Sequence, residues 1–109
     1  MYYAYRNCIE ACLECMAVCN HCASSCLQER DVDKMTQCIR LDLECAAICK
    51  AAADLMSLGS PHANAICQVC ADICTACAEE CEKHAMDHCR HCATVCRKCA
   101  EECVSMIAA

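Results

Sequence analysis

Cysteine recurs at helical spacing along this chain of 109 residues. Between residues 8 and 26, six cysteines are separated by alternating gaps of four and three residues. At about 100° per residue, this spacing places all six on one stripe of an α-helix, roughly 80° wide. Two later stretches repeat the pattern with five cysteines each, and a stretch between them carries three. The nineteen cysteines are Cys8, Cys12, Cys15, Cys19, Cys22, Cys26, Cys38, Cys45, Cys49, Cys67, Cys70, Cys74, Cys77, Cys81, Cys89, Cys92, Cys96, Cys99 and Cys103.

A stripe of thiols stands where a helical bundle would normally carry leucine. Cysteine can act as a small buried hydrophobe, but it fills space less well than leucine, so a core of nineteen would pack loosely. Disulfides are disfavoured because neighbouring side chains on one helix face project side by side, and because an odd number cannot pair completely. Six CxxC pairs each place two sulfurs within reach of one ion. The pattern therefore favours a metal site.

Cu(I) is the ion that these stripes suit best. Zinc prefers closed tetrahedral sites, which straight helical stripes are poor at building in number. Iron–sulfur clusters need converging cysteines, and the ferredoxin motif C-x2-C-x2-C-x3-C-P does not occur in the sequence. Cu(I) is soft and favours thiolates, and one Cu(I) per bridging thiolate leaves a buried core near neutral. We expect multiple Cu(I) ions, with an iron–sulfur or zinc-binding protein as the alternative.

Three histidines are expected at one end of the thiol stripes. His84 continues the third stripe, His88 precedes the fourth, and His91 sits beside Cys92. We expect these histidines to form a mouth, where ligands weaker than thiolate admit Cu(I) and pass it inward. Solvated turn histidines are the alternative interpretation.

Two other features concern the interior. Asp42 points toward the thiol face of its helix. We expect it to be an edge residue paired with a neighbour, and keep a metal contact or proton acceptance as alternatives. At the end opposite the histidines we expect an apolar plug, in which the two methionines could also act as thioether ligands. The plug residues are Met56, Leu58, Met106 and Ile107.

Four helices are needed to hold these stripes. The chain has one Gly, one Pro, no Trp and no Phe, and it is rich in Ala, which favours helix over sheet. The expected helices cover about residues 5–28, 34–58, 61–84 and 88–106. Short connections make consecutive helices antiparallel neighbours. The sequence therefore predicts an all-α, up-down-up-down four-helix bundle with a cysteine-lined core, in which residues 1–109 form one domain.

The expected helix boundaries rest on capping residues. Asp31 or Asp33 is a candidate N-cap for the second helix, and Gly59 suits the position after its end. Ser60 is the expected N-cap of the third helix, with Pro61 at its first helical position. Asp87 is the expected N-cap of the fourth.

The charge and the apolar runs limit the partners. A formal net charge of −6 without a basic stripe argues against nucleic-acid binding. No apolar run is long enough to span a bilayer, and the N-terminal stretch lacks the pattern of a signal peptide. We therefore expect a cytoplasmic protein with free thiols and no membrane or nucleic-acid partner.

The cysteine motifs carry a family resemblance. The segments CIEACLECMAVCNHC, CIRLDLECAAIC, ICQVCADICTACAEECEKH and HCRHCATVCRKCAEEC resemble the cytosolic branch of the bacterial four-helix-bundle copper storage proteins. The resemblance covers nearly the whole chain. It implies many Cu(I) ions along the core, histidines near the entrance, a homotetramer, protection against copper toxicity and no catalytic turnover. It is also compatible with a protein that donates or accepts copper.

Overall fold

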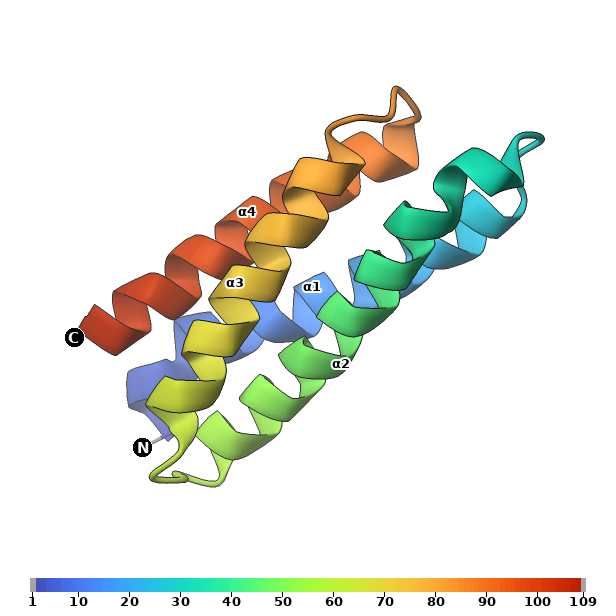
Figure 1. Cartoon of the computed structure of the whole chain (residues 1–109). Coiled ribbons are helices and arrows are strands. Elements are labelled where there is room, and N and C mark those ends of the chain that lie inside the picture. Colours follow the sequence, from blue (N-terminus) through green and yellow to red (C-terminus); the bar gives the residue numbers. More distant parts are fainter. Residues whose placement is uncertain (1, 109) are drawn as a thin grey trace.

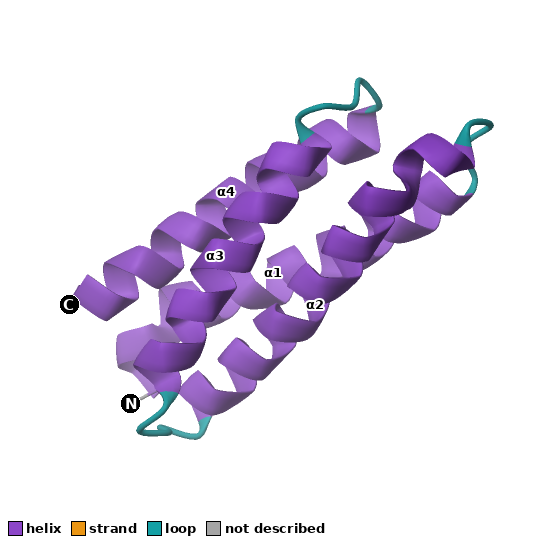
Figure 2. Cartoon of the chain, in the orientation of Figure 1, coloured by secondary structure: helices purple, strands orange, loops and turns teal. Residues whose placement is uncertain are grey.

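Four α-helices make up nearly all of residues 2–108, the part of the chain that the computed structural model describes. They are α1 (Tyr2–Leu27), α2 (Thr36–Ser57), α3 (Ala63–Cys81) and α4 (Asp87–Ala108), and a short 3₁₀ helix, η1 (Val32–Met35), precedes α2. Figure 2 shows loops only at the two ends of the molecule and no strand in the described residues. None of the described helices is long and apolar enough to cross a membrane.

The helices form an up-down-up-down bundle (Figure 1), as the sequence predicts. Each packs against two neighbours: α1 and α3 both contact α2 and α4. The bundle measures 45 × 19 × 18 Å. The α1–α2 and α3–α4 turns share one end, which we call the paired-turn end. The start of α1, the end of α4 and the α2–α3 turn share the other, which we call the terminal end.

The α2–α3 turn ends α2 as predicted. Gly59 has a φ of 67°, which is favourable for glycine because it lacks a Cβ atom. The Ser60 N–H donates to the Leu55 carbonyl at 3.0 Å, and the Gly59 N–H donates to the Met56 carbonyl at 3.1 Å. These two bonds form a Schellman motif, which satisfies the last carbonyls of α2.

The predicted start of α3 is two residues too early. The helix begins at Ala63, because the Ala63 N–H bonds to the Ser60 carbonyl at 3.2 Å and closes a tighter turn first. Pro61 therefore lies in this turn and is not the first helical residue. The Ser60 hydroxyl still accepts the His62 N–H at 3.0 Å, so this serine satisfies one backbone donor ahead of the helix.

The predicted caps of α2 and α4 are wrong. Asp31 makes no side-chain capping bond, and η1 intervenes before α2 begins at Thr36, whose hydroxyl donates to the Asp33 carbonyl at 3.0 Å. Asp87 is the first residue of α4 and not its cap. There the Met86 carbonyl accepts the Arg90 N–H at 3.0 Å. Both helices therefore start from backbone-bonded turns.

The core consists of thiols flanked by small side chains. All nineteen cysteines are buried. Alanines on the neighbouring faces have no atoms beyond Cβ, so they allow the helices to approach closely around the sulfurs. The buried alanines are Ala11, Ala23, Ala46, Ala52, Ala53, Ala63, Ala71, Ala78, Ala93 and Ala100.

Candidate metal centre

All nineteen cysteines are free thiols. The shortest sulfur–sulfur contact, between Cys45 and Cys74, is 3.5 Å. A disulfide bond measures about 2.05 Å, so no pair is bonded. Contacts of this length instead leave each sulfur available to a metal ion placed between two of them.

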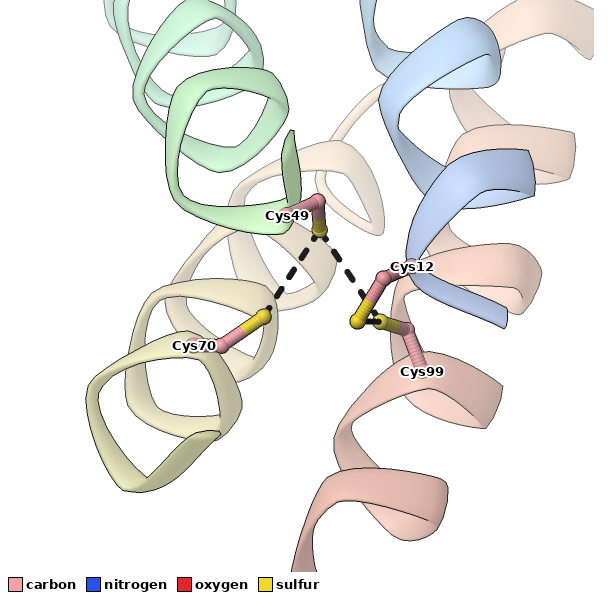
Figure 3. A group of neighbouring side chains, drawn as sticks. All are labelled: Cys12, Cys49, Cys70 and Cys99. Carbon is pink, nitrogen blue, oxygen red and sulfur yellow. Dashed lines mark hydrogen bonds between the residues drawn. The ribbon is translucent and has the colours of Figure 1, made fainter. Parts of the chain in front are cut away.

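Twelve sulfurs form one connected set through thiol–thiol contacts of 3.5–4.0 Å, which we call the deep network. Figure 3 shows a part of it in which each helix contributes one sulfur. Cys49 lies 3.7 Å from Cys70 and 3.9 Å from Cys99, and Cys99 lies 3.7 Å from Cys12. The deep network comprises Cys8, Cys12, Cys15, Cys19, Cys45, Cys49, Cys70, Cys74, Cys92, Cys96, Cys99 and Cys103.

Five sulfurs at the paired-turn end form a second connected set, the outer network. Its members are Cys22, Cys26, Cys38, Cys81 and Cys89, joined by contacts of 3.6–4.0 Å. Four of them lie close enough together to share one ion: Cys22, Cys26, Cys38 and Cys89. The outer network therefore provides a multi-thiol site near the predicted mouth.

His88 adds a nitrogen ligand to the outer network. Its Nδ1 atom lies 3.5 Å from the Cys89 sulfur, 3.6 Å from that of Cys22 and 3.9 Å from that of Cys26. Its Nε2 atom lies 3.0 Å from the Glu29 carboxylate, 59 residues away in sequence. The carboxylate can only accept, so the ring proton is on Nε2 and the Nδ1 lone pair faces the sulfurs.

The other two predicted histidines lie away from the thiols. The Nε2 atom of His84 lies 3.0 Å from the Glu80 carboxylate, and His91 is exposed. Because α3 ends at Cys81, His84 lies in the turn and does not continue the cysteine stripe. Neither histidine makes a hydrogen-bonding contact with any thiol among the described residues. Of the three, only His88 meets the sulfurs.

Asp42 lies between the two networks. Its Oδ1 atom is 3.2 Å from the Cys77 sulfur, 3.4 Å from Cys92 and 3.6 Å from Cys81, and its Oδ2 atom is 3.8 Å from Cys38. Cys92 belongs to the deep network, whereas Cys38 and Cys81 belong to the outer one. Within residues 2–108, no thiol–thiol contact of hydrogen-bond geometry joins the networks directly, so the carboxyl group is their link.

The sequence-based expectation of an edge position for Asp42 is wrong. The residue is fully buried, the only charged residue type in the described core. Position 42 lies four residues after Cys38 and three before Cys45, so it occupies the thiol stripe itself. Removal from water, together with the negative charge of the neighbouring Cys92, raises the pKa of the Asp42 carboxyl to about 8.

Burial also favours the neutral form of the outer thiols. Loss of solvation raises the pKa of Cys89 to about 11 and shifts the pKa of Cys26 upward as well. At neutral pH these groups therefore hold their protons. A soft cation that binds them must displace those protons, which couples binding to pH.

Two cysteines belong to neither network. Cys77 contacts the Asp42 carboxylate and shares a four-sulfur group with three members of the deep network. Cys67, fully buried on α3, makes no thiol–thiol contact of hydrogen-bond geometry in the described chain. The contact between His88 and Glu29 has no counterpart in sequence reasoning, because no local spacing connects residues on different helices.

A four-helix bundle with an interior of free thiols defines a binding protein for soft metal ions. The chain matches the sequence model of the copper storage protein family, Csp, over residues 1–108, and it belongs to that family. This membership confirms the resemblance read from the cysteine motifs.

Solved relatives share the fold. The Cu(I)-bound copper storage protein BsCsp3 is 51% identical, with a TM-score of 0.92, and the match covers 95% of this chain and 98% of that one. A cytosolic copper storage protein of Streptomyces lividans, solved with five coppers, is 41% identical with a TM-score of 0.94, over 98% of this chain and 94% of that one. The cysteine-rich protein YhjQ of Bacillus subtilis is 54% identical over 81 residues, 74% of this chain and 75% of that protein.

Proposed function

We propose that this protein stores Cu(I) in the cytosol and thereby protects the cell from copper toxicity. The observation that carries the proposal is the set of buried free thiols in two networks, which together run along the bundle. Thiolates are soft ligands and suit Cu(I). The similarity to a Cu(I)-bound storage protein and to a cytosolic one supports this function over the zinc and iron–sulfur alternatives.

Charge balance explains how so many thiolates can be buried together. Each Cu(I) that binds replaces the proton of a thiol, so the core gains no net charge as it fills. A divalent ion at the same ratio would leave one uncompensated positive charge per sulfur. The expected capacity is therefore comparable to the number of cysteines.

The ions enter through the outer network. His88 presents the Nδ1 lone pair to three thiols while Glu29 holds the other side of the ring. An arriving ion first exchanges a ligand with this nitrogen and then moves to the sulfurs, which release their protons. His84 and His91 serve as outer histidines of the mouth. All nineteen cysteines and the three histidines are the proposed metal ligands.

From the outer network the ion passes Asp42 to the deep network. The carboxylate contacts sulfurs of both sets, so it lies at the only described link between them. At this position it can accept protons that the thiols release, since the raised pKa of the carboxyl keeps it close to a protonation change near neutral pH. Asp42 thus connects rapid capture with long-term storage.

The further properties that we propose follow from storage. The protein performs no catalytic turnover, since its task is complete when the ion is held. It forms a homotetramer and exchanges copper with a donor or acceptor protein, without nucleic acid or membrane as a partner. Residues 1–109 act as a single domain. Sedimentation of the metal-free and loaded protein tests the tetramer.

An anaerobic titration with Cu(I) against a competing chelator tests the storage function. We expect many equivalents to bind per chain, approaching the cysteine count. Saturation below about a quarter of the thiols would contradict storage by bridging thiolates, and visible absorption with acid-labile sulfide would point to an iron–sulfur protein. A core in which zinc survives the same competition would point to a zinc protein.

A further inference from the structure

The terminal end carries a surface pocket of about 430 Å³ that reaches the thiol core. It lies between the first turns of α1, the last turns of α4 and the start of α3. Its wall includes Cys8 and the thioether of Met106, and its rim is polar, with Asn7, Asn64 and Glu102. A volume of this size is typical of sites for small ligands.

Cys8 differs from every other cysteine in its contact with the surface. Its side chain retains 2% of its exposure, whereas each of the other eighteen cysteines is at 0%. Cys8 is also the only cysteine in the lining of this pocket. The thiol therefore sits at the boundary between solvent and core, at the end opposite His88.

The expected apolar plug does not close this end. Met56 is fully buried, and Leu58 is 79% exposed and so points away from the core. Leu58 is the last residue before the glycine turn, where the chain already leaves the helix. Met106 and Ile107 are only partly buried and form walls of the pocket. The prediction of a plug is wrong at Leu58 and incomplete at the other positions.

Sulfur contacts continue inward from Cys8 without a gap. Its sulfur lies 3.6 Å from that of Cys103, which lies 4.0 Å from Cys12, and Cys12 lies 3.7 Å from Cys99. All four belong to the deep network. An ion bound at Cys8 thus reaches the deep network without passing the outer network or Asp42.

We propose that Cys8 forms a second copper exchange site, at which a low-molecular-weight thiol delivers Cu(I) to the deep network or withdraws it. This inference rests on the proposed storage function. In delivery, the Cys8 sulfur binds the Cu(I) of the incoming thiolate complex, and the proton of Cys8 passes to the departing thiolate, which leaves as a free thiol. Copper stays Cu(I), and the reverse exchange withdraws it. The Met106 thioether, a soft ligand, holds the ion during the exchange.

A matched pair of variants tests the second site. Cys8→Ser and Cys67→Ser each remove one thiol at the terminal end, but Cys67 is fully buried and does not line the pocket. Both are made in a His88→Ala background, which slows the other route. The probe is the Cu(I) complex of glutathione, mixed anaerobically with the metal-free protein. We expect Cys8→Ser to take up copper about tenfold more slowly than Cys67→Ser, the scale of effect found when metal-site residues are replaced.

The outcomes separate this site from the storage function. Equal uptake rates with full capacity in both variants would refute the second exchange site and leave storage intact. A low capacity in the unmodified protein would instead refute storage. Circular dichroism verifies that both variants are folded.

Alkylation of the metal-free protein offers a second measurement that involves no copper. Limiting iodoacetamide followed by peptide mapping should modify Cys8 before the buried Cys67 and Cys103. Modification of Cys67 or Cys103 ahead of Cys8 would contradict the accessibility on which the proposal depends.

Discussion

The outer and deep networks use the same side chain in different surroundings. The outer network combines five thiols with the imidazole of His88, which Glu29 orients from the bundle surface. The deep network has twelve thiols in mutual contact, and only Cys92 among them contacts an oxygen, that of Asp42. Nitrogen and oxygen are weaker ligands than thiolate for Cu(I), so they allow faster exchange. The difference suggests that the outer network sets the rate of uptake and the deep network sets the capacity.

The largest expected effect concerns Asp42, at the junction of the networks. Its folded pKa of about 8 lies above the ordinary 3.8, so between these values the folded protein holds a proton that the unfolded chain has released. The stability of the metal-free protein should therefore fall as the pH rises from about 4 to about 8, by up to several kcal/mol.

Chemical denaturation at several pH values, under reducing conditions, measures this dependence. The groups that face Asp42 are the thiols of Cys38, Cys77, Cys81 and Cys92. They remain in the matched Asp42→Asn variant, in which the amide cannot ionise. The difference between the two proteins isolates the carboxyl. If the wild type and the variant lose stability in parallel, the junction holds no extra proton.

Two triple variants compare the networks directly. Cys22, Cys26 and Cys89 surround His88 in the outer network, whereas Cys15, Cys45 and Cys96 contact one another in the deep network. Replacing either trio with serine removes the same number of thiols. We expect similar losses of capacity, but only the outer trio should slow uptake, by about 10–100-fold.

The donor in this comparison is the bis(bicinchoninate) complex of Cu(I), whose loss of colour reports uptake. It is too bulky for the small pocket at the terminal end, so it reports the route through the outer network. Similar rates for the two triple variants would mean that the networks do not divide rate from capacity.

The single variant His88→Ala should slow uptake from the same donor by about tenfold, with nearly full capacity. The reason is that Nδ1 is the only imidazole nitrogen that contacts the outer thiols. His91→Ala is the matched control, because His91 lies on the same helix but is exposed. Equal slowing in both variants would assign capture to the histidine surface as a whole and not to His88.

The sequence predicts the regular features of this molecule and misses those that depend on contacts between helices. Repeated cysteine spacing predicts four helices, their topology and the thiol core, because a stripe of one residue type fixes the inward face. Gly59 is predicted correctly because a positive φ favours glycine. The start of α3 is misplaced because a tight turn at Ser60 is set by backbone bonds.

The site residues follow the same rule. The burial of the cysteines follows from periodicity, but their division into two networks depends on sulfur distances across helices. Asp42 is misplaced because a carboxylate in a core is uncommon, although its position on the cysteine stripe was visible in the sequence. The three histidines look alike in sequence, and only the path of the chain after Cys81 separates His88 from His84.

The smallest expected effect tests how His88 is held. His88 and His84 make similar pairs, each with an Nε2 atom 3.0 Å from a glutamate, but only His88 presents its other nitrogen to thiols. Glu29→Gln removes the charge that fixes the ring proton on Nε2 and makes Nδ1 more basic. Uptake from the bulky donor should slow by about two- to threefold, less than for His88→Ala, because the ring itself remains.

Glu80→Gln is the matched control, since it alters the pair that lies away from the sulfurs. It should leave the rate unchanged. An NMR measurement of the ring nitrogens adds a readout independent of uptake: in the metal-free protein the proton of His88 should sit on Nε2, and Glu29→Gln should shift the population toward the Nδ1-protonated form. An unchanged tautomer together with slower uptake would show that Glu29 acts through local charge, because the orientation of the ring would then be set by its packing against the thiols.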